Sequence, residues 1–309
     1  MGVALNQLLL QVLNMRGFRL HIILTFFLAA LMLSCEKRLL PEDQNVIIVE
    51  GWIDAGGQPV VMVTRSLPVR LRDDAIELEH LSDYVIKFAR VTVSDGVNSV
   101  LLTGRVDTRY VPGYIYTSNF LTGEAGKTYT LTVRTGGQHL EAETTIPLYP
   151  PSVDSVVCGH APSDPSRCEV TAYLKRNSGR EEYFKSFYQE GVGQAQFLSS
   201  FLGVVDGSLT DSLFTIPVIK GITDYDKSDD SRFFANDTLV SLKISAMDDI
   251  SYEIWRSYED NNRFRSMLFS SSVREVATNI EGGRGYWCGF NSFRLDFKAV
   301  PGTYPGNNL

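Results

Sequence analysis

Basic residues are few in this sequence. The chain of 309 residues has 29 Lys and Arg against 36 Asp and Glu, which gives a formal net charge of −7 at pH 7. Proteins that follow nucleic-acid phosphates need a basic surface. The composition therefore excludes a nucleic-acid binder as the default interpretation, and we expect no nucleic acid among the partners.

Histidine and the common catalytic motifs are also scarce. Beyond the N-terminal region, the histidines are His80, His139 and His160, which stand in dissimilar contexts without the spacing of a zinc motif. No Gly-x-Ser-x-Gly elbow occurs, and the Gly191 to Gln196 stretch departs from the dinucleotide fingerprint. We therefore predict no metal site, no cofactor site and no catalytic residue.

Long hydrophobic runs are missing as well. The longest apolar run, from Ile22 to Leu33, has 12 residues, whereas a helix needs roughly 20 to span a bilayer. It follows Arg16 and Arg19 and precedes Ser34, which is the pattern of a secretory signal peptide rather than of a permanent anchor. We predict a signal peptide over residues 1–34. Its true start could be Met15, since the first 14 residues carry no charge.

The residues that end this segment resemble a bacterial lipobox. Leu31 to Ser34 are apolar and small residues placed directly before Cys35. The resemblance implies cleavage before Cys35 and a diacylglyceryl group on its thiol, a lipid that palmitate would label. The alternative is a cysteine that merely follows a signal peptide cleaved elsewhere. Two acyl chains suffice for stable anchoring, and residues 35–45 then form a polar tether.

Three cysteines remain after Cys35 is assigned to lipid. Cys158 and Cys168 flank a stretch of turn residues between two alternating apolar runs. We expect a disulfide across this hairpin, since an envelope compartment is oxidising; the alternative is two reduced cysteines in neighbouring strands. Cys288 stands among aromatic residues and is predicted to be a buried small hydrophobe rather than a nucleophile.

Most of the remaining sequence alternates with period two, as half-buried strands do. Seven short strands are predicted between residues 46 and 147, which favours an immunoglobulin-like β-sandwich. They are expected at 46–53, 60–64, 84–93, 100–103, 114–116, 128–133 and 140–145. The prolines from Pro147 to Pro151 indicate a domain boundary.

Residues 148–309 are predicted to form a second, β-rich domain with one short helix. The helix is expected to begin at Asp248 or Asp249 and to bury a stripe of apolar residues, with acidic and basic residues outside. The stripe consists of Ile250, Ile254, Trp255 and Tyr258, and the outer residues are Glu253, Arg256, Glu259 and Asp260. The fold class is therefore all-β.

Exposed aromatic residues could form a ligand surface. The densest group near a turn is Tyr110, Tyr114 and Tyr116. Alternate tyrosines in a β-sandwich also occur as half-packed sheet residues, and the sequence leaves both interpretations open.

Three stretches together resemble the domain of unknown function 4249 family. They are Ile48 to Ile53, Gly113 to Tyr116 followed by Gly126 to Val133, and Thr278 to Tyr286. The family comprises envelope lipoproteins found mostly in Bacteroidetes. The resemblance implies an immunoglobulin-like N-terminal domain, a β-rich C-terminal domain and an outer-membrane location near transport systems. It carries no catalytic residues to this chain.

These observations lead to one expected function and one alternative. We expect a non-enzymatic cell-envelope lipoprotein that acts as a binding or accessory module of an outer-membrane transport or surface assembly. A TonB-dependent outer-membrane receptor is the expected partner. The alternative is an envelope hydrolase acting on glycan or peptide, because carboxylates paired in space leave no mark in sequence.

Overall fold

The computed structural model describes residues 46–66, 78–162, 164–177, 180, 182–191, 196–221, 232–265 and 276–306. From Gln44 onward the chain forms one compact unit. Strands dominate this unit, and a single long α-helix accompanies them in the described part. The predicted all-β class is therefore confirmed.

Seven strands form the first half. They are β1 (Ile47–Asp54), β2 (Val60–Arg65), β3 (Arg90–Ser94), β4 (Ser99–Val106), β5 (Tyr114–Thr117), β6 (Thr128–Thr135) and β7 (Gln138–Thr145). The strand predicted over 84–93 is wrong in its first part, because a 3-10 helix (Leu78–Tyr84) precedes β3. The segment between them is held by strands of the sheet, since the Tyr116 hydroxyl on β5 donates to the Ile86 carbonyl and accepts from the Ala89 N–H.

The second half has nine strands and the helix. The strands are β8 (Val153–His160), β9 (Arg167–Lys175), β10 (Tyr183–Glu190), β11 (Leu198–Asp206), β12 (Leu213–Val218), β13 (Phe234–Ala235), β14 (Leu239–Met247), β15 (Arg284–Lys298) and β16 (Gly302–Pro305). The helix is α2 (Asp249–Arg265), and a 3-10 turn covers Gly207–Leu209. The alternating apolar stretches of this half predict strands at 153–158, 168–175, 183–188, 213–219 and 239–246, so β11, β13 and β16 are strands that the sequence did not predict.

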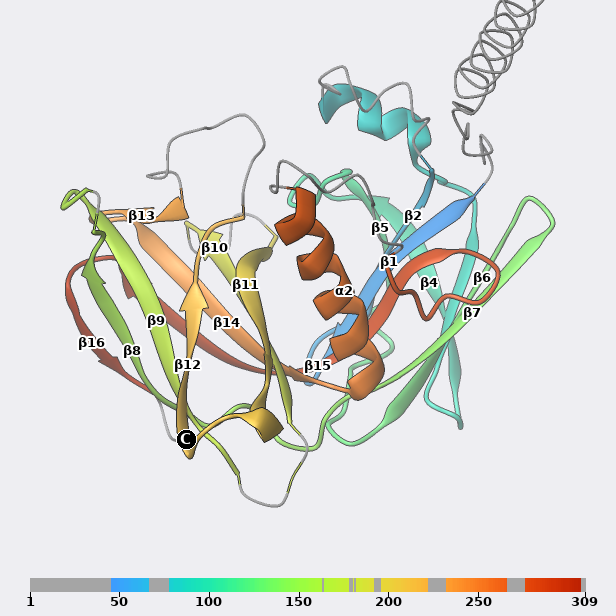
Figure 1. Cartoon of the computed structure of the whole chain (residues 1–309). Coiled ribbons are helices and arrows are strands. Elements are labelled where there is room, and N and C mark those ends of the chain that lie inside the picture. Colours follow the sequence, from blue (N-terminus) through green and yellow to red (C-terminus); the bar gives the residue numbers. More distant parts are fainter. Residues whose placement is uncertain are drawn as a thin grey trace, which may run out of the picture. The chain divides into compact units, whose positions relative to one another are not determined.

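One large sheet runs through both halves. Its eleven strands lie in the order β11-β10-β14-β15-β1-β2-β5-β4-β3-β6-β7, and a smaller sheet has the order β12-β9-β8-β16, with β13 paired to β9. The halves join where β1 pairs in parallel with β15, with Glu50 opposite Tyr286. In Figure 1 the strands of the two halves lie on either side of α2.

Two glycines allow β1 and β15 to pair closely at this junction. Gly285 has a φ of +111°, and a Cβ there would collide with the Val49 carbonyl on β1. Gly51 lies against the ring of Trp287, at 2.9 Å from the place of its missing Cβ. A side chain at either position would push β1 away from β15 or displace the tryptophan.

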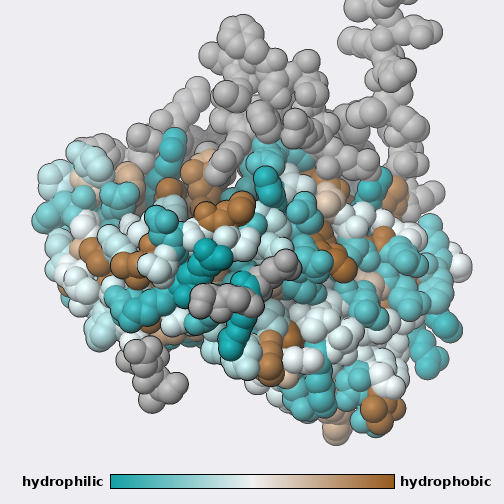
Figure 2. Space-filling view, turned by 60° about the horizontal axis from the view of Figure 1, so that its bottom comes forward, coloured by the Kyte–Doolittle hydropathy of each residue, from teal (hydrophilic) through white to brown (hydrophobic). Residues whose placement is uncertain are grey.

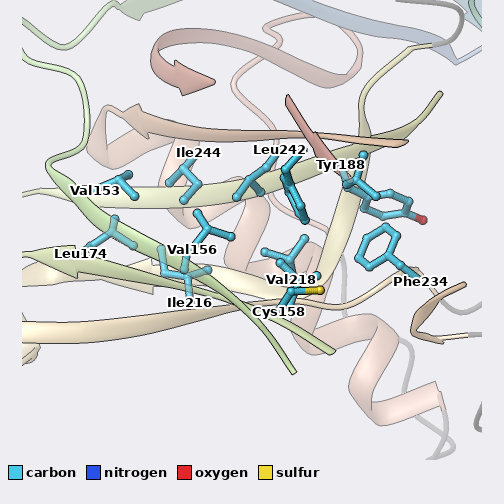
Figure 3. Packing of buried hydrophobic residues seen from close by; sticks show 14 of the residues in the cluster. Val153, Val156, Cys158, Leu174, Tyr188, Ile216, Val218, Phe234, Leu242 and Ile244 are labelled. Carbon is cyan, nitrogen blue, oxygen red and sulfur yellow. The ribbon is translucent and has the colours of Figure 1, made fainter. Parts of the chain in front are cut away.

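Two hydrophobic cores lie on one face of the large sheet. The first-half core combines Val49, Ile53 and Val63 with residues of β3, β6 and β7, and it includes Trp287. The second-half core fills the space between β10, β14 and β15 and the smaller sheet, where Leu242 and Ile244 face residues such as Ile216 (Figure 3). Alternate residues of the large sheet therefore point away from both cores.

The first core takes most of its residues from before the predicted boundary at residues 147–148, but it also includes Ile280 and Trp287 from beyond it. Strand β15 contributes to both cores, with Trp287 in the first core and Phe297 in the second. The division into residues 46–147 and 148–309 stays a prediction, while hydrogen-bonded pairing continues across it.

Candidate functional site

The second face of the large sheet forms the floor of a cavity. On β1 the residues at odd positions enter the first-half core, so Glu50, Trp52 and Asp54 point the other way. The same alternation turns Lys243 of β14 and Phe187 of β10 toward this face. Period-two geometry thus collects charged and aromatic side chains from strands far apart in sequence.

Helix α2 covers part of this face, and its N-terminus is fixed by Asp248. One carboxylate oxygen of Asp248 accepts from the Ser251 N–H at 2.8 Å, which is the N-cap interaction. The other accepts from the Thr144 hydroxyl and the Thr145 N–H, both at 2.8 Å. The predicted helix start is therefore confirmed, and the cap also ties α2 to β7.

The buried stripe of α2 differs from the predicted one. Ile254 and Trp255 are buried as predicted, but Ile250 and Tyr258 are 49% and 44% exposed. Glu259, predicted to lie outside, is buried instead. The reason is an ionic partner on the sheet, since Lys185 Nζ lies 2.6 Å from Glu259 Oε1.

The cavity between these elements has a volume of about 1000 Å³. This lies at the upper end of the range usual for small-molecule sites. Aromatic side chains supply much of its wall: Trp52, Tyr110, Phe187, Phe197, Trp255, Tyr258, Tyr286 and Phe290. The arrangement suits a ligand with a sizeable apolar body.

Asp54 lines the cavity, and its carboxylate has several hydrogen-bond and ion-pair partners. Its carboxylate contacts Lys243 Nζ at 2.7 and 2.9 Å, accepts from the Ser292 hydroxyl at 3.1 Å, and lies 3.4 Å from an Arg294 nitrogen. Burial lowers the pKa of Lys243, and the neighbouring Asp54 carboxylate opposes that shift. Lys243 also lies 5.0 Å from the ring centroid of Phe290. These contacts make a closed ionic network around Asp54.

A second buried ion pair stands beneath α2. The Lys185 ammonium donates to Glu259 and, at 2.7 Å, to the Ser200 carbonyl. Glu259 also accepts the Gly203 N–H at 2.9 Å and the Val204 N–H at 3.1 Å. Burial lowers the pKa of Lys185, with Glu259 acting in the opposite direction. The pair fastens α2 to β10 and β11.

Glu50 also lines the cavity, and the contacts of its carboxylate differ from those of Asp54. Among the described residues, no hydrogen-bond or ion-pair partner contacts its carboxylate. Burial raises the pKa of Glu50 above its usual value, with no charged group contributing to the shift. Burial also raises the pKa of Tyr286, its neighbour across β1 and β15, well above the usual value.

The predicted tyrosine surface is divided by the structure. Tyr110 lines the cavity and packs against Trp52, with ring centroids 6.0 Å apart. Tyr114 and Tyr116 do not line it, because their hydroxyls donate to the Lys87 and Ile86 carbonyls on the segment before β3. Tyr116 is 2% exposed, so it is a core residue.

The predicted disulfide is not formed in the structure. Cys158 and Cys168 are buried free cysteines on β8 and β9. The strand register pairs Cys168 with His160 and Cys158 with Val170, so the two thiols are diagonal neighbours rather than directly opposed. Burial raises the pKa of Cys158 to about 12. Cys288 is buried, as predicted, with its pKa raised by burial to about 12.

Several predictions concern residues outside the described part. These are the signal peptide, the lipid-bearing Cys35 and the tether to residue 45. In the part that is described, no helix is long and apolar enough to cross a membrane. Within the same ranges, no group of three His, Cys, Asp or Glu side chains could hold a metal ion.

Sequence reasoning missed Glu50, Lys243 and Lys185. Each is a charge inside a strand whose alternate residues are apolar, as in the Ile47 to Ile53 stretch. That pattern also describes an ordinary solvent-facing strand residue. The distinguishing signal was the large aromatic residue two positions away from a charge, such as Trp52 beside Glu50 and Phe187 beside Lys185.

Comparison with known proteins agrees with the family resemblance. No curated protein matches the chain. A family model described as a domain of unknown function, DUF4249, matches residues 37–295. The matched range includes the β1–β15 junction and every cavity-lining residue named above. Because this match covers most of the sequence, the chain belongs to the DUF4249 family.

Proposed function

We propose that this protein is a lipid-anchored, non-enzymatic binding module of the bacterial cell envelope, and that the cavity above the large sheet holds its ligand. The observation that carries the proposal is the cavity itself, about 1000 Å³ in volume and walled by aromatic side chains. Concave spaces of several hundred Å³ that are lined mainly by apolar and aromatic side chains are the usual form of small-molecule sites. A space of this size lined by rings is therefore best explained by a bound molecule.

The outer face shown in Figure 2 is the alternative location for a ligand site, and it is less suited to binding. Hydrophobic residues there form small groups separated by hydrophilic ones. Binding surfaces for proteins or membranes usually expose a broader apolar patch. This contrast supports the cavity, rather than that face, as the ligand site.

A binding role is favoured over hydrolysis by the placement of the cavity carboxylates. Glu50 and Asp54 are four residues apart on one strand, so their Cα atoms are separated by about 13 Å. Glycoside hydrolases hold their two carboxyl groups roughly 5 to 9.5 Å apart. Asp54 is moreover occupied by Lys243, Ser292 and Arg294. This geometry supports the non-enzymatic role over the hydrolase alternative.

Binding in the cavity can be tested with N-pentyl dansylamide, a neutral fluorescent probe with an aromatic body. We expect saturable binding with a blue-shifted emission to the mature protein in detergent. The Trp52→Ala variant should bind about tenfold more weakly, since a large apolar contact is lost. Phe88→Ala is the matched control, because Phe88 is 96% exposed and distant from the lining. Absence of saturable binding to the wild type would refute the proposal that the cavity binds a ligand.

The lipid anchor rests on the pattern of Arg16, Arg19, the apolar run and Cys35. Metabolic labelling with palmitate should mark the wild type and leave Cys35→Ala unlabelled. The variant should appear in the soluble envelope fraction or as an uncleaved precursor. A Cys35→Ala product that remains membrane-bound after a salt wash would contradict the anchor.

We further propose an outer-membrane location and a TonB-dependent receptor as partner. The support is the family resemblance and the predicted anchor. Cross-linking in intact cells, followed by purification of the lipoprotein, should recover such a receptor with the wild type and lose it with Cys35→Ala. Recovery of none with the correctly anchored protein would count against this partner.

A further inference from the structure

Glu50 is the most unusual polar group of the cavity. It borders the empty space and is otherwise surrounded by protein, and no hydrogen bond or ion pair reaches it from the described residues. An ionised carboxylate without a partner in such a place is costly, because it has lost water and gained nothing in return. The other buried acids of this region, Asp54 and Glu259, each have a lysine.

Arg284 also lines this cavity, but no hydrogen bond or ion pair joins it to Glu50, and no charged group contributes to the raised pKa of Glu50. The basic residues of the lining that have described contacts are engaged elsewhere: Lys243 and Arg294 contact Asp54, and Arg109 forms a 2.7 Å ion pair with Asp107. An anionic ligand held by Lys243, Arg294 or Arg109 would have to disrupt these pairs. A cation placed against Glu50 would disrupt none.

Aromatic side chains stand next to this carboxylate. Tyr286 lies opposite Glu50 on β15, and its ring centroid is 5.3 Å from that of Trp255. Trp255 in turn lies 5.9 Å from Tyr258. Aromatic rings beside a carboxylate are a common environment for ammonium groups, since ring faces attract cations. Trp52 follows on the same strand face and extends the apolar surface toward Asp54.

Building on the ligand-binding role proposed above, we propose that the Glu50 end of the cavity binds the cationic nitrogen of an amphipathic ligand whose apolar body lies along Trp52. The ligand class is a primary or substituted amine carried on an aromatic or alkyl body. Glu50 supplies the counter-charge, and the Tyr286 and Trp255 rings flank the ammonium group. The Asp54–Lys243 network lies further along the same strand face and lines the cavity beyond Trp52.

A set of three dansyl probes of equal chain length tests this inference. Dansylcadaverine carries an ammonium group, N-pentyl dansylamide is neutral, and dansyl-6-aminohexanoate carries a carboxylate. Fluorescence titration of the wild type should give an affinity for the cationic probe at least about tenfold above that for the neutral one. The anionic probe should be the weakest of the three.

Glu50→Gln keeps the shape of the side chain and removes its charge. In this variant the roughly tenfold preference for the cationic probe over the neutral probe should vanish. Glu143→Gln is the matched control, since Glu143 is exposed on β7 and outside the cavity lining. It should preserve the tenfold preference.

The outcomes separate the two proposals. Equal affinity of the wild type for the cationic and neutral probes, or a preference that persists in Glu50→Gln, overturns the inference and leaves the binding role standing. Tightest binding of the anionic probe also overturns it. Binding of none of the three overturns both. The comparison among probes uses the wild type alone, so it holds even if Glu50→Gln fails to fold.

Discussion

Single charged residues on the inner face of the large sheet differ in whether they have partners. Asp54 and Glu259 each accept several hydrogen bonds, whereas Glu50 accepts none within the described ranges. A buried acid that gains partners stabilises the fold when ionised, and one that gains none destabilises it. The two carboxylates of β1 that face the cavity therefore have opposite effects on stability.

Glu50 should make the ligand-free protein less stable as the pH rises. Its pKa is raised in the folded state, so the folded protein binds more protons than the unfolded one above pH 4.5. Stability is therefore lost between that value and the folded-state pKa. Tyr286, the nearby titratable group, stays neutral over this range because its pKa is raised well above 10.

Thermal melts of wild type and Glu50→Gln from pH 4 to pH 8 test this. The Tm advantage of Glu50→Gln should grow with pH and reach about 2 °C or more at pH 8. Glu143→Gln should show no such trend. A Tm difference that stays constant over the whole range would contradict the assignment.

Removing Lys243 should expose the cost of a broken buried pair. Lys243→Met leaves Asp54 with Ser292 and the more distant Arg294 nitrogen, and we expect a loss of about 3 kcal/mol in the free energy of unfolding. Adding Asp54→Leu to Lys243→Met should recover part of this loss, because no buried charge is left alone. Urea denaturation of the single and double variants checks the sign, and strictly additive losses would refute the coupling.

At the scale of elements, α2 depends on one carboxylate at its N-terminus. Asp248 caps the helix through Ser251 and holds β7 through Thr144 and Thr145. A cap alone contributes about 1 kcal/mol, and here the same side chain also satisfies two groups on a strand. The position of the cavity wall therefore rests on this residue.

Asp248→Ala should cost about 2 to 3 kcal/mol in the free energy of unfolding. It should also weaken binding of the neutral dansyl probe, because α2 carries Ile254 and Trp255 of the lining. Asp249→Ala is the control, since Asp249 is exposed and its carboxylate bonds only to the adjacent Ile250 N–H. Equal losses in the two variants would argue against the cap and tether.

The contact between β1 and β15 depends in the same way on Gly285. In Gly285→Ala the new methyl group would strike the Val49 carbonyl, and the φ of +111° would be strained. We expect a loss of several kcal/mol or failure to accumulate as folded protein. Gly136→Ala tests strain alone, because Gly136 has a φ of +54° and open space around it. Its cost should be about 1 kcal/mol, so similar stabilities for the two variants would contradict this account.

For the molecule as a whole, the sequence predicted the class and most strands but not the cavity. Alternating patterns located β1, β6 and β7 because each of those strands buries one face in a core. The residues of β2 form a continuous apolar run, because both faces of that strand are buried. Strand β11 was not predicted because its residues do not alternate regularly between buried and exposed positions. Of the three predicted tyrosines, only Tyr110 lines the cavity. The sequence does not show which face of the sheet is covered by α2, so it could not separate Tyr110 from the other two.

The pairing of β1 with β15 sets the order in which the fold can be completed. A chain that is made from its N-terminus presents β1 early, yet the partner of Ile48 is Arg284, near the other end. Until that partner arrives, one edge of β1 has open backbone donors and acceptors, which is a hazard for aggregation. Contacts between such distant residues also slow folding. Removal of β15 would therefore leave β1 paired only with β2 among the described strands, with its other edge open.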